Sequence, residues 1–533
     1  MRRVVLPRVA GAILLVTILA CLSPAVLRAQ PAVQQQLQRV AQGDSSGPFA
    51  PTWDSLGAYR TPAWFRDAKF GIFIHWGVYS VPAFGSEWYS RNMYQRDNPA
   101  FQHHIATYGP QSKFGYKDFI PLFRGEHFDP DAWVDLFSRS GARYIVPVAE
   151  HCDGFAMYDS AITPWNAARM GPHRDIVGAL AVATRKRGLH FGASSHRAEH
   201  WWWYNGGMQF ASDVQNPRYA ALYGPARPMQ LPGVNTAKEP DPNHLEQWLA
   251  PDKAFMDDWL ARSSEIVEKY HPDLLYFDWW IGQPAFQPYL QRFAAYFYNQ
   301  ASQRQQGVVL TYKDNDFPEN AAVLDIERGK LDAIRLLPWQ TDTSVSIHSW
   351  GYVAHDEYRD AKSLIDELVD IVSKNGNMLL NVGPKSDGTI PPEARTVLLQ
   401  IGEWLQTNGK AIYGSRPWLV FGEGPTRVTS SALNTDRQQF TAEDVRYTTH
   451  NGALYAIALG WPTSGDLLLR TLWQGTPYLP GPVCSVQLLG SSARLTWQQR
   501  SDGLRIQLPH PQPDEPAFAF RILTQSGGGH CGH

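Results

Sequence analysis

The stretch Asp273-Leu-Leu-Tyr-Phe-Asp278-Trp-Trp280 decides both the fold and the candidate site. Its apolar residues predict a short buried strand that ends at Asp278. An unpaired carboxylate in an apolar setting is costly, so packing alone does not explain this acid. An acid at the carboxyl end of a barrel strand is typical of a catalytic residue, and the neighbouring Trp279 and Trp280 indicate an aromatic pocket. The alternative is that Asp278 caps the next helix.

Strand and helix patterns alternate on both sides of this stretch, over residues 61–415. Predicted strands are Phe70–His75, Tyr144–Ala149, His190–Ser195, Leu274–Asp278, Val308–Tyr312, Val323–Ile326, Ala333–Leu336 and Met378–Val382. Predicted helices are Pro130–Ser140, Ile176–Arg187, Lys253–Tyr270, Phe286–Gln303, Glu357–Lys374 and Pro392–Asn408. This alternation favours an α/β fold with parallel strands. About eight strands without a Gly-x-Gly-x-x-Gly turn favour a (β/α)8-like barrel over a doubly wound sheet.

A different pattern covers residues 416–526. Short alternating segments separated by Gly, Pro, Asn and Asp predict a C-terminal antiparallel β-sandwich. These segments are Tyr447–His450, Leu454–Leu459, Gly465–Leu469, Val483–Leu489, Ala493–Gln498, Gly503–Leu508 and Ala517–Leu523. Residues 30–60 form a polar, Gln-rich leader, and residues 527–533 are expected to be a disordered tail.

Residues 1–29 resemble a signal peptide. Arg2-Arg3 supplies the positive end, Gly11–Leu22 is an apolar run too short to span a bilayer comfortably, and Ala29 offers a small residue for cleavage. We therefore expect export to the periplasm or the medium. The alternative is a lipid-anchored form, because Ile18-Leu19-Ala20-Cys21 is a poor lipobox.

Composition narrows the class of partner. The formal net charge is −2 and acids and bases are interspersed, so no basic stripe suits nucleic acid and no polybasic segment suits a membrane surface. The 20 Trp, 23 Tyr and 24 Phe favour carbohydrate, because aromatic rings stack on the C–H faces of sugars, although many of these rings also belong to the core.

Polar side chains fall at the predicted carboxyl ends of six successive strands, where barrel enzymes place their active sites. A lone His at such a position is more often structural, but six coincidences favour an enzyme. The residues are His75, the run Glu150–Phe155 that contains His151, then His196, Asp278, Lys313 with Asp314, and Glu327.

Three other chemistries fit less well. The pair His151-Cys152 lacks the Arg and the Gly-rich cradle of a phosphate-binding Cys loop. The run His196-Arg-Ala-Glu199-His200 matches the zinc-protease pattern His-x-x-Glu-His, but it follows a strand and not a helix start. A serine hydrolase is not indicated, because no Gly-x-Ser-x-Gly motif follows a predicted strand. We therefore expect no metal.

Carboxylate chemistry remains. Hydrolysis of a glycosidic bond needs one acid to protonate the departing oxygen and a second carboxylate as nucleophile or base. Asp278 suits the second role. Glu327 suits the first, because it follows another predicted strand, whereas Asp325 lies on the same side but deeper in the barrel.

Six segments between Trp64 and Trp418 resemble the α-L-fucosidases of glycoside hydrolase family 29. They are Trp64-Phe-Arg-Asp-Ala-Lys-Phe-Gly-Ile-Phe-Ile-His-Trp-Gly77, Ser86-Glu-Trp-Tyr89, Glu150-His-Cys-Asp-Gly-Phe155, Asp273–Asp278, Ser349-Trp-Gly-Tyr352 and Asn375-Gly-Asn-Met-Leu-Leu-Asn-Val-Gly-Pro384. The resemblance implies a barrel-like catalytic domain followed by a β-sandwich. It also implies retention of anomeric configuration through a covalent fucosyl–enzyme, with no cofactor.

Residue roles follow from the same resemblance. Asp278 matches the nucleophile, and Trp350 matches an aromatic residue near the methyl group of the sugar. Lys313 stands where many members have Arg. The remaining expected substrate-binding residues are His75, Glu87, Trp88, His151 and His196, the last in a segment Ser194-Ser195-His196 that departs from the Tyr and Ser common there.

Two further departures concern the chemistry. Cys152 replaces the second of two adjacent His, so one hydrogen bond to the sugar is lost or supplied otherwise. Gln340 stands where part of the family has the acid/base Glu, and an amide cannot deliver a proton. We therefore assign the acid/base role to Glu327, in a Glu-Arg-Gly run, with Glu87 as the reserve.

The sequence thus predicts an exo-acting, retaining α-L-fucosidase that acts on fucosylated oligosaccharides or glycoconjugates. One alternative is a non-catalytic fucose-binding protein in which Gln340 marks a lost acid. Another is an α-L-galactosidase on the same scaffold, because a methyl-sized slot rejects an added hydroxyl only modestly. No pattern indicates an oligomeric state.

Overall fold

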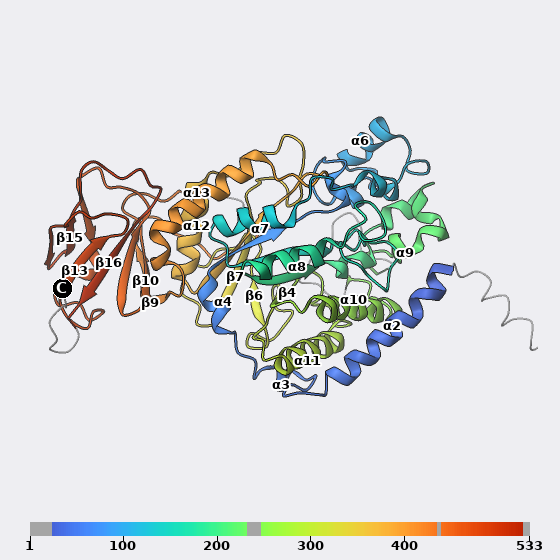
Figure 1. Ribbon diagram of the computed structural model, residues 1–533, viewed down its shortest axis with the longest axis horizontal. Helices are drawn as coiled ribbons and strands as arrows, with labels where there is room; N and C mark the ends of the chain where they lie inside the picture. Colours follow the sequence, from blue (N-terminus) through green and yellow to red (C-terminus); the bar gives the residue numbers. More distant parts are fainter. Residues whose placement is uncertain (1–23, 232–246, 434–438, 526–533) are drawn as a thin grey trace, which may run out of the picture.

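Eight parallel strands close into a barrel, and the sequence prediction of a (β/α)8-like fold is confirmed (Figure 1). The computed structural model describes residues 24–231, 247–433 and 439–525. Residues 1–23 of the predicted signal peptide (residues 1–29), which include Cys21, and the predicted tail 527–533 lie outside these residues. The strands run in the order β1 to β8: β1 (Phe70–Ile74), β2 (Tyr144–Glu150), β3 (His190–Ser195), β4 (Leu274–Phe277), β5 (Val309–Tyr312), β6 (Val323–Asp325), β7 (Trp339–Ser344) and β8 (Gly376–Val382).

The strands form because apolar side chains must be buried on both faces of a parallel sheet. All residues of β1, β2 and β8 are buried. Ile72 of β1 stands in register with Ile145 of β2 on one side and Leu380 of β8 on the other. At Gly71 a side chain would meet the ring of Tyr144 at 2.4 Å, so a glycine lets that ring fill the barrel interior.

Helices surround the barrel in Figure 1. They include α2 (Pro24–Gly43), α3 (Trp53–Leu56), α4 (Ala63–Ala68), α5 (Tyr89–Asn92), α6 (Pro99–Tyr108), α7 (Pro130–Arg139), α8 (Ile176–Lys186), α9 (Ala220–Tyr223), α10 (Lys253–Tyr270), α11 (Gln287–Gln303), α12 (Ala361–Ser373) and α13 (Pro392–Asn408). Aspartates cap several of them: Asp175, Asp252 and Asp360 each accept a backbone N–H of the first turn of the following helix. Helix α2 begins inside the predicted signal peptide, continues into the expected polar leader, and packs against α10 and α11.

The predicted seventh strand is wrong. Residues 333–336 form no strand, and Leu336 is 93% exposed, whereas β7 begins at Trp339. All six residues of β7 are buried although five of them are polar. The prediction followed apolar side chains. In this strand, however, polar groups point into the barrel and find partners there, as when Gln340 donates to Asp325 at 2.6 Å.

The C-terminal segment forms two antiparallel sheets that lie beside α12 and α13 (Figure 1). One sheet has the order β13-β16-β11-β10-β9 and the other β12-β15-β14. Their bounds are β9 (Arg416–Glu423), β10 (Val445–His450), β11 (Ala453–Ala458), β12 (Asp466–Leu469), β13 (Val483–Leu488), β14 (Trp497–Arg500), β15 (Gly503–Gln507) and β16 (Phe518–Thr524). The sequence missed β9 and placed β14 too early, at Ala493. A buried ion pair of 2.6 Å between Arg446 and Asp370 ties this body to α12 of the barrel.

Within the part of the chain that the structure describes, no helix has both the length and the apolar character that crossing a membrane requires.

Candidate active site

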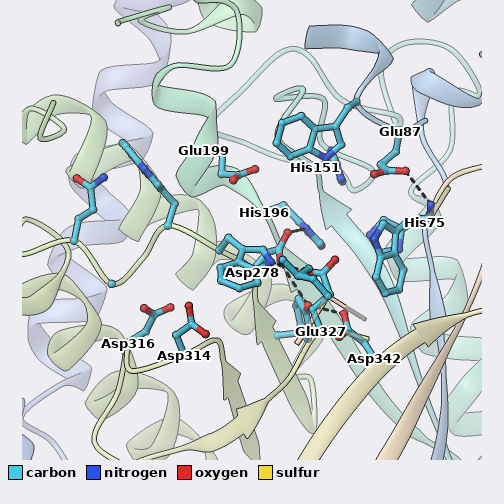
Figure 2. A pocket seen from close by; sticks show the side chains of 18 of the residues that line it. His75, Glu87, His151, His196, Glu199, Asp278, Asp314, Asp316, Glu327 and Asp342 are labelled. Atoms are coloured by element: carbon cyan, nitrogen blue, oxygen red, sulfur yellow. Dashed lines mark hydrogen bonds and ion pairs between the residues drawn. The ribbon is translucent and has the colours of Figure 1, made fainter. Parts of the chain in front are cut away.

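A cavity of about 360 Å³ opens at the carboxyl ends of the barrel strands (Figure 2). Its size is that of a small-ligand pocket. Eight of the nine site residues predicted from the sequence line it: His75, Glu87, Trp88, His151, His196, Asp278, Glu327 and Trp350. The ninth, Lys313, lines a smaller neighbouring hollow together with Glu327. The topology thus brings residues from six different strand ends together, as the sequence predicted.

Asp278 follows β4 and does not cap a helix. Its carboxylate accepts a hydrogen bond from Nδ1 of His196 at 2.6 Å, and the other ring nitrogen of His196 lies 2.9 Å from the hydroxyl of Ser194. Burial by itself would raise the pKa of Asp278, but the adjacent His196 outweighs it, and the pKa lies below its ordinary value. Asp278 is therefore ionised, as a nucleophile must be.

Glu327 follows β6 and lines the same cavity. Burial raises its pKa to about 7, and nearby Asp342 and Asp278 act in the same direction, whereas Lys313 opposes the shift. The indole N–H of Trp279 donates a hydrogen bond to its Oε2 atom. A carboxyl group that holds its proton near neutral pH suits a general acid. Both carboxyl groups point into the cavity in Figure 2.

Lys313 is the buried cation of a carboxylate network. Its Nζ atom lies 2.6 Å from Asp325, 3.0 Å from Asp342 and 4.0 Å from Glu327. Tyr276 donates to the second oxygen of Asp342 at 2.9 Å. Burial favours the neutral amine, but the carboxylates raise the pKa of Lys313 above its ordinary value, so it stays charged. A direct contact between Lys313 and substrate stays a prediction.

Three imidazoles, His75, His151 and His196, form a second group in the cavity. Their ring nitrogens lie within 4.8 Å of one another, close enough to hold a metal ion. However, both ring nitrogens of His196 already have partners, so the trio suits sugar hydroxyls better than a metal. Burial lowers the pKa of His75 to about 3 and that of His151 well below its usual value, so these two rings are neutral. Buried Nδ1 of His151 has no partner among the described residues and is free to bind a hydroxyl.

Glu87 has a structural task at the cavity wall. Its Oε2 atom accepts hydrogen bonds from the hydroxyl of Ser349 at 3.0 Å and from the backbone N–H of Trp350 at 2.9 Å. Asn381 donates to the carbonyl of Trp350 at 2.7 Å, and the guanidinium of Arg328 lies 4.7 Å from its ring centroid. These contacts fix the indole of Trp350, which the family resemblance predicts to lie near the methyl group of the sugar.

Of the residues that compete with Glu327 for the acid role, Glu87 lines the same cavity, whereas Gln340 and Asp325 do not. Gln340 is fully buried, and its carbonyl accepts from the hydroxyl of Tyr144 at 2.8 Å while its amide donates to Asp325. Asp325 in turn pairs with Lys313. Neither Gln340 nor Asp325 lines the cavity of about 360 Å³; Asp325 lines only the smaller neighbouring hollow, beside Lys313.

The His-x-x-Glu-His run does not form a zinc site. Residues Arg197–Trp201 form a 3-10 helix and not the α-helix that would align the two histidines. Nδ1 of His200 donates to the carbonyl of Cys152 at 2.8 Å, and the thiol of Cys152 donates to Glu199 at 3.1 Å. Cys152 is thus a partner of Glu199, and Glu199 itself reaches the cavity.

Sequence reasoning missed several residues that line the cavity. Asp342 was hidden by the misplaced seventh strand, and Tyr276 was read as apolar core. Glu199 lay inside a rejected motif. The others, for which the sequence offered no distinct signal, are Trp248, Gly282, Gln283, Asp316 and Leu433.

Comparisons with known proteins agree with this geometry. A family model for α-L-fucosidase matches residues 36–410, and a model for the α-L-fucosidase C-terminal domain matches residues 437–523. The chain is 32% identical over 483 residues to the human tissue α-L-fucosidase, covering 89% of this chain and 91% of the relative. It is 32% identical to the α-L-fucosidase of Branchiostoma floridae over 474 residues, 86% of this chain and 92% of that protein.

Solved structures point the same way. The crystal structure of Thermotoga maritima α-fucosidase in complex with fucose matches with a TM-score of 0.68 and 28% identity, covering 89% of this chain and all of that chain. The structure of the same enzyme with a mechanism-based inhibitor matches with a TM-score of 0.70 and 28% identity, at the same coverage. The chain belongs to the α-L-fucosidase family of glycoside hydrolases.

Proposed function

We propose that this protein is an exo-acting, retaining α-L-fucosidase in which Asp278 is the nucleophile and Glu327 is the acid/base. The observation that carries the proposal is that two carboxyl groups in one cavity have opposite pKa shifts, Asp278 downward and Glu327 upward. Such a division of two carboxyl groups into an ionised and a protonated member is what glycoside hydrolysis requires.

In the first step the carboxylate of Asp278 attacks the anomeric carbon, and the bond to the leaving oxygen breaks. That oxygen takes the proton of Glu327, so a fucosyl ester of Asp278 and a neutral alcohol are formed. In the second step Glu327, now ionised, takes a proton from water, whose oxygen attacks the anomeric carbon and releases Asp278. Retention requires the two carboxyl groups to lie roughly 5–5.5 Å apart, and this separation stays a prediction.

The remaining cavity residues support a deoxy sugar as the substrate. The neutral rings of His75 and His151 offer hydrogen-bonding atoms to hydroxyl groups, and Trp350 offers an apolar face to a methyl group. An α-L-galactoside differs only by a hydroxyl on that methyl carbon, so we expect it to be a weaker substrate by a factor of about 100 or less.

Hydrolysis of an aryl α-L-fucoside tests the proposal. The wild-type protein is expected to release the phenol with the α-anomer of fucose as the first product, which NMR detects before mutarotation. Asp278→Asn is expected to lower kcat/KM by roughly a thousandfold or more while it still binds fucose, because only the bond-forming oxygen is lost. Fucose binding without turnover in the wild-type protein would instead support the sugar-binding alternative, in which Gln340 marks a lost acid.

We also propose that the protein is exported to the periplasm or the medium, from the charged and apolar pattern of residues 1–29. N-terminal sequencing of the mature protein tests this. A terminus near residue 30 is expected, a lipid-modified terminus at Cys21 would support the anchored form, and an intact Met1 would contradict export.

A further inference from the structure

One side of the cavity is not used by the mechanism above. Figure 2 shows Asp314 and Asp316 on the side of Asp278 opposite to His75 and Glu87. Both acids follow β5 and line the cavity, together with Trp279, Trp280 and Gln283 of the segment after β4. We name this set of five residues the outer wall: Trp279, Trp280, Gln283, Asp314 and Asp316.

The outer wall contains polar groups without partners. Gln283 is 2% exposed, and its amide nitrogen has no hydrogen-bond partner among the described residues. The indole N–H of Trp280 is likewise buried and without a partner in the described chain. A buried donor left unpaired is costly, so two of them on one wall indicate a ligand that accepts hydrogen bonds.

The backbone of the outer wall adopts conformations that few side chains favour. Trp280 has a φ of +81°, which is rare for a bulky residue, and Asp314 has a φ of +48°. At Gly282 a side chain would meet Oδ1 of Asp316 at 2.1 Å, so only glycine lets this carboxyl group stand where it does. Such strain accumulates where function requires a particular placement of side chains.

The position of the outer wall relative to Glu327 identifies the part of the substrate that it meets. A general acid lies beside the oxygen that leaves, and the indole N–H of Trp279 is hydrogen-bonded to Glu327. The residues that follow Trp279 therefore extend away from the acid on the leaving-group side. The three imidazoles occupy the opposite side, where the fucosyl unit is proposed to bind.

The chemistry of the outer wall suits an uncharged sugar. Its indoles can stack on C–H faces, the amide of Gln283 can donate to ring or hydroxyl oxygens, and the carboxyl groups can accept from hydroxyl groups. Burial, with Asp314 acting in the same direction, raises the pKa of Asp316, so the pair carries less than two full charges. The pair still repels anions, because no cation forms an ion pair with either acid among the described residues. Lys313 acts on both acids only from a distance, and it is paired with Asp325 and Asp342.

We propose that the outer wall is a binding site for the leaving group, selective for a neutral, hydroxyl-rich sugar over one that carries a sulfate or carboxylate. This inference rests on the proposed function and names its substrate class: fucose linked to an uncharged sugar. Aryl fucosides, which offer few hydroxyl groups on the leaving side, use the site only in part.

Three substrates test the inference: 4-nitrophenyl α-L-fucoside, an α-L-fucosyl disaccharide with neutral N-acetylglucosamine as leaving group, and the same disaccharide sulfated on that sugar. The wild-type protein is expected to prefer the neutral to the sulfated disaccharide by about tenfold or more in kcat/KM, and added salt is expected to narrow that preference. Gln283→Met, close to isosteric, is expected to lower the ratio of disaccharide to aryl-fucoside kcat/KM about fivefold to tenfold, the effect of one lost hydrogen bond.

Asp314→Asn tests the charge. Because Asp314 is exposed, the substitution carries little risk for folding, and we expect it to narrow the neutral-to-sulfated preference by about threefold or more. The matched control is Asp502→Asn in the β14–β15 turn of the sandwich, which removes one carboxylate far from the cavity. The turn should be kept, because Asn before Gly503 favours a tight hairpin turn as Asp does. The control should leave both ratios as in the wild-type protein.

The outcomes separate the two proposals. If the wild-type protein cleaves none of the three fucosides, the proposed function fails and this inference fails with it. A second outcome is that the wild-type protein cleaves the aryl fucoside while the disaccharide-to-aryl and neutral-to-sulfated ratios of kcat/KM stay at their wild-type values in Gln283→Met, Asp314→Asn and the control. In that case only the inference is refuted. A disaccharide preference that is lost with EDTA and restored by Ca²⁺ would assign the carboxylates to a cation and would also refute it.

Discussion

Replacement of Trp279 by Phe should move the alkaline limb of the pH–rate profile upward. The indole N–H of Trp279 donates to Glu327, and a donor of this kind stabilises the ionised carboxylate. Trp279→Phe keeps an aromatic ring but removes the donor, so the pKa of Glu327 should rise. Glu327 must be protonated to act as the acid. A higher pKa therefore extends activity to higher pH.

The size of the shift follows from the strength of that hydrogen bond. Hydrogen bonds to charged groups contribute about 1.5–3 kcal/mol, and one pKa unit corresponds to about 1.4 kcal/mol, which gives about one to two units if nothing replaces the donor. The Glu327 side chain is 13% exposed, so water can replace part of the interaction. We expect a shift of about one unit, from the value of about 7 that burial and neighbouring charges produce in the wild-type protein.

The assay is kcat/KM for an aryl α-L-fucoside as a function of pH, which reports the ionisations of the free enzyme. The control is Trp280→Phe, the same substitution in the next residue, whose N–H has no partner among the described residues. Its alkaline limb should stay in place even if its rate falls. An alkaline limb that is unmoved in Trp279→Phe, or that moves to lower pH, would show that the group titrating there is not Glu327.

Three further predictions concern the same cavity. Glu327→Ala should slow substrates with poor leaving groups most, and azide should restore turnover of an aryl fucoside, which product analysis checks; full activity on unactivated fucosides would remove Glu327 from the acid role. Lys313→Met should lower the free energy of unfolding by about 3–5 kcal/mol, because it leaves buried carboxylates without their cation, and a denaturant midpoint equal to that of the wild-type protein would contradict this. His196→Phe should move the acid limb of the pH–rate profile to higher pH. Without the imidazole of His196, burial is no longer outweighed, and the pKa of the Asp278 carboxyl group rises.

Most of the barrel could be predicted from the sequence because its strands are apolar and short. Where a strand is built from polar residues, this signal fails. Strand β7 begins at Trp339 and carries Gln340 and Asp342 into the barrel, so a search for apolar runs chose the exposed segment around Leu336 instead. A buried polar residue is recognisable only from its partners, and these come from distant parts of the chain.

The candidate site shows the same division. Residues directly after apolar strands, such as Asp278 and Glu327, could be found because the strand ends mark the active face of a barrel. Glu199 and Gln283 could not be found, because they reach the cavity from connecting segments whose course the local sequence does not determine. The orientation of Gln340 could not be predicted either. Its alignment with a family motif gives its position in the chain, but it does not show that the side chain points into the barrel interior.

The division of labour between the two proposed catalytic acids depends on their partners more than on their residue types. Both carboxyl groups are removed from water, which by itself would keep both protonated. Asp278 has the imidazole of His196 at 2.6 Å and is ionised, whereas the nearest cation to Glu327 is Lys313 at 4.0 Å, whose charge two other carboxylates already share. Lys313 thus neutralises part of the negative charge of Asp325 and Asp342 in the barrel interior, while Glu327 keeps its proton. A protonated acid therefore persists beside an ionised nucleophile in a cavity that is rich in carboxyl groups.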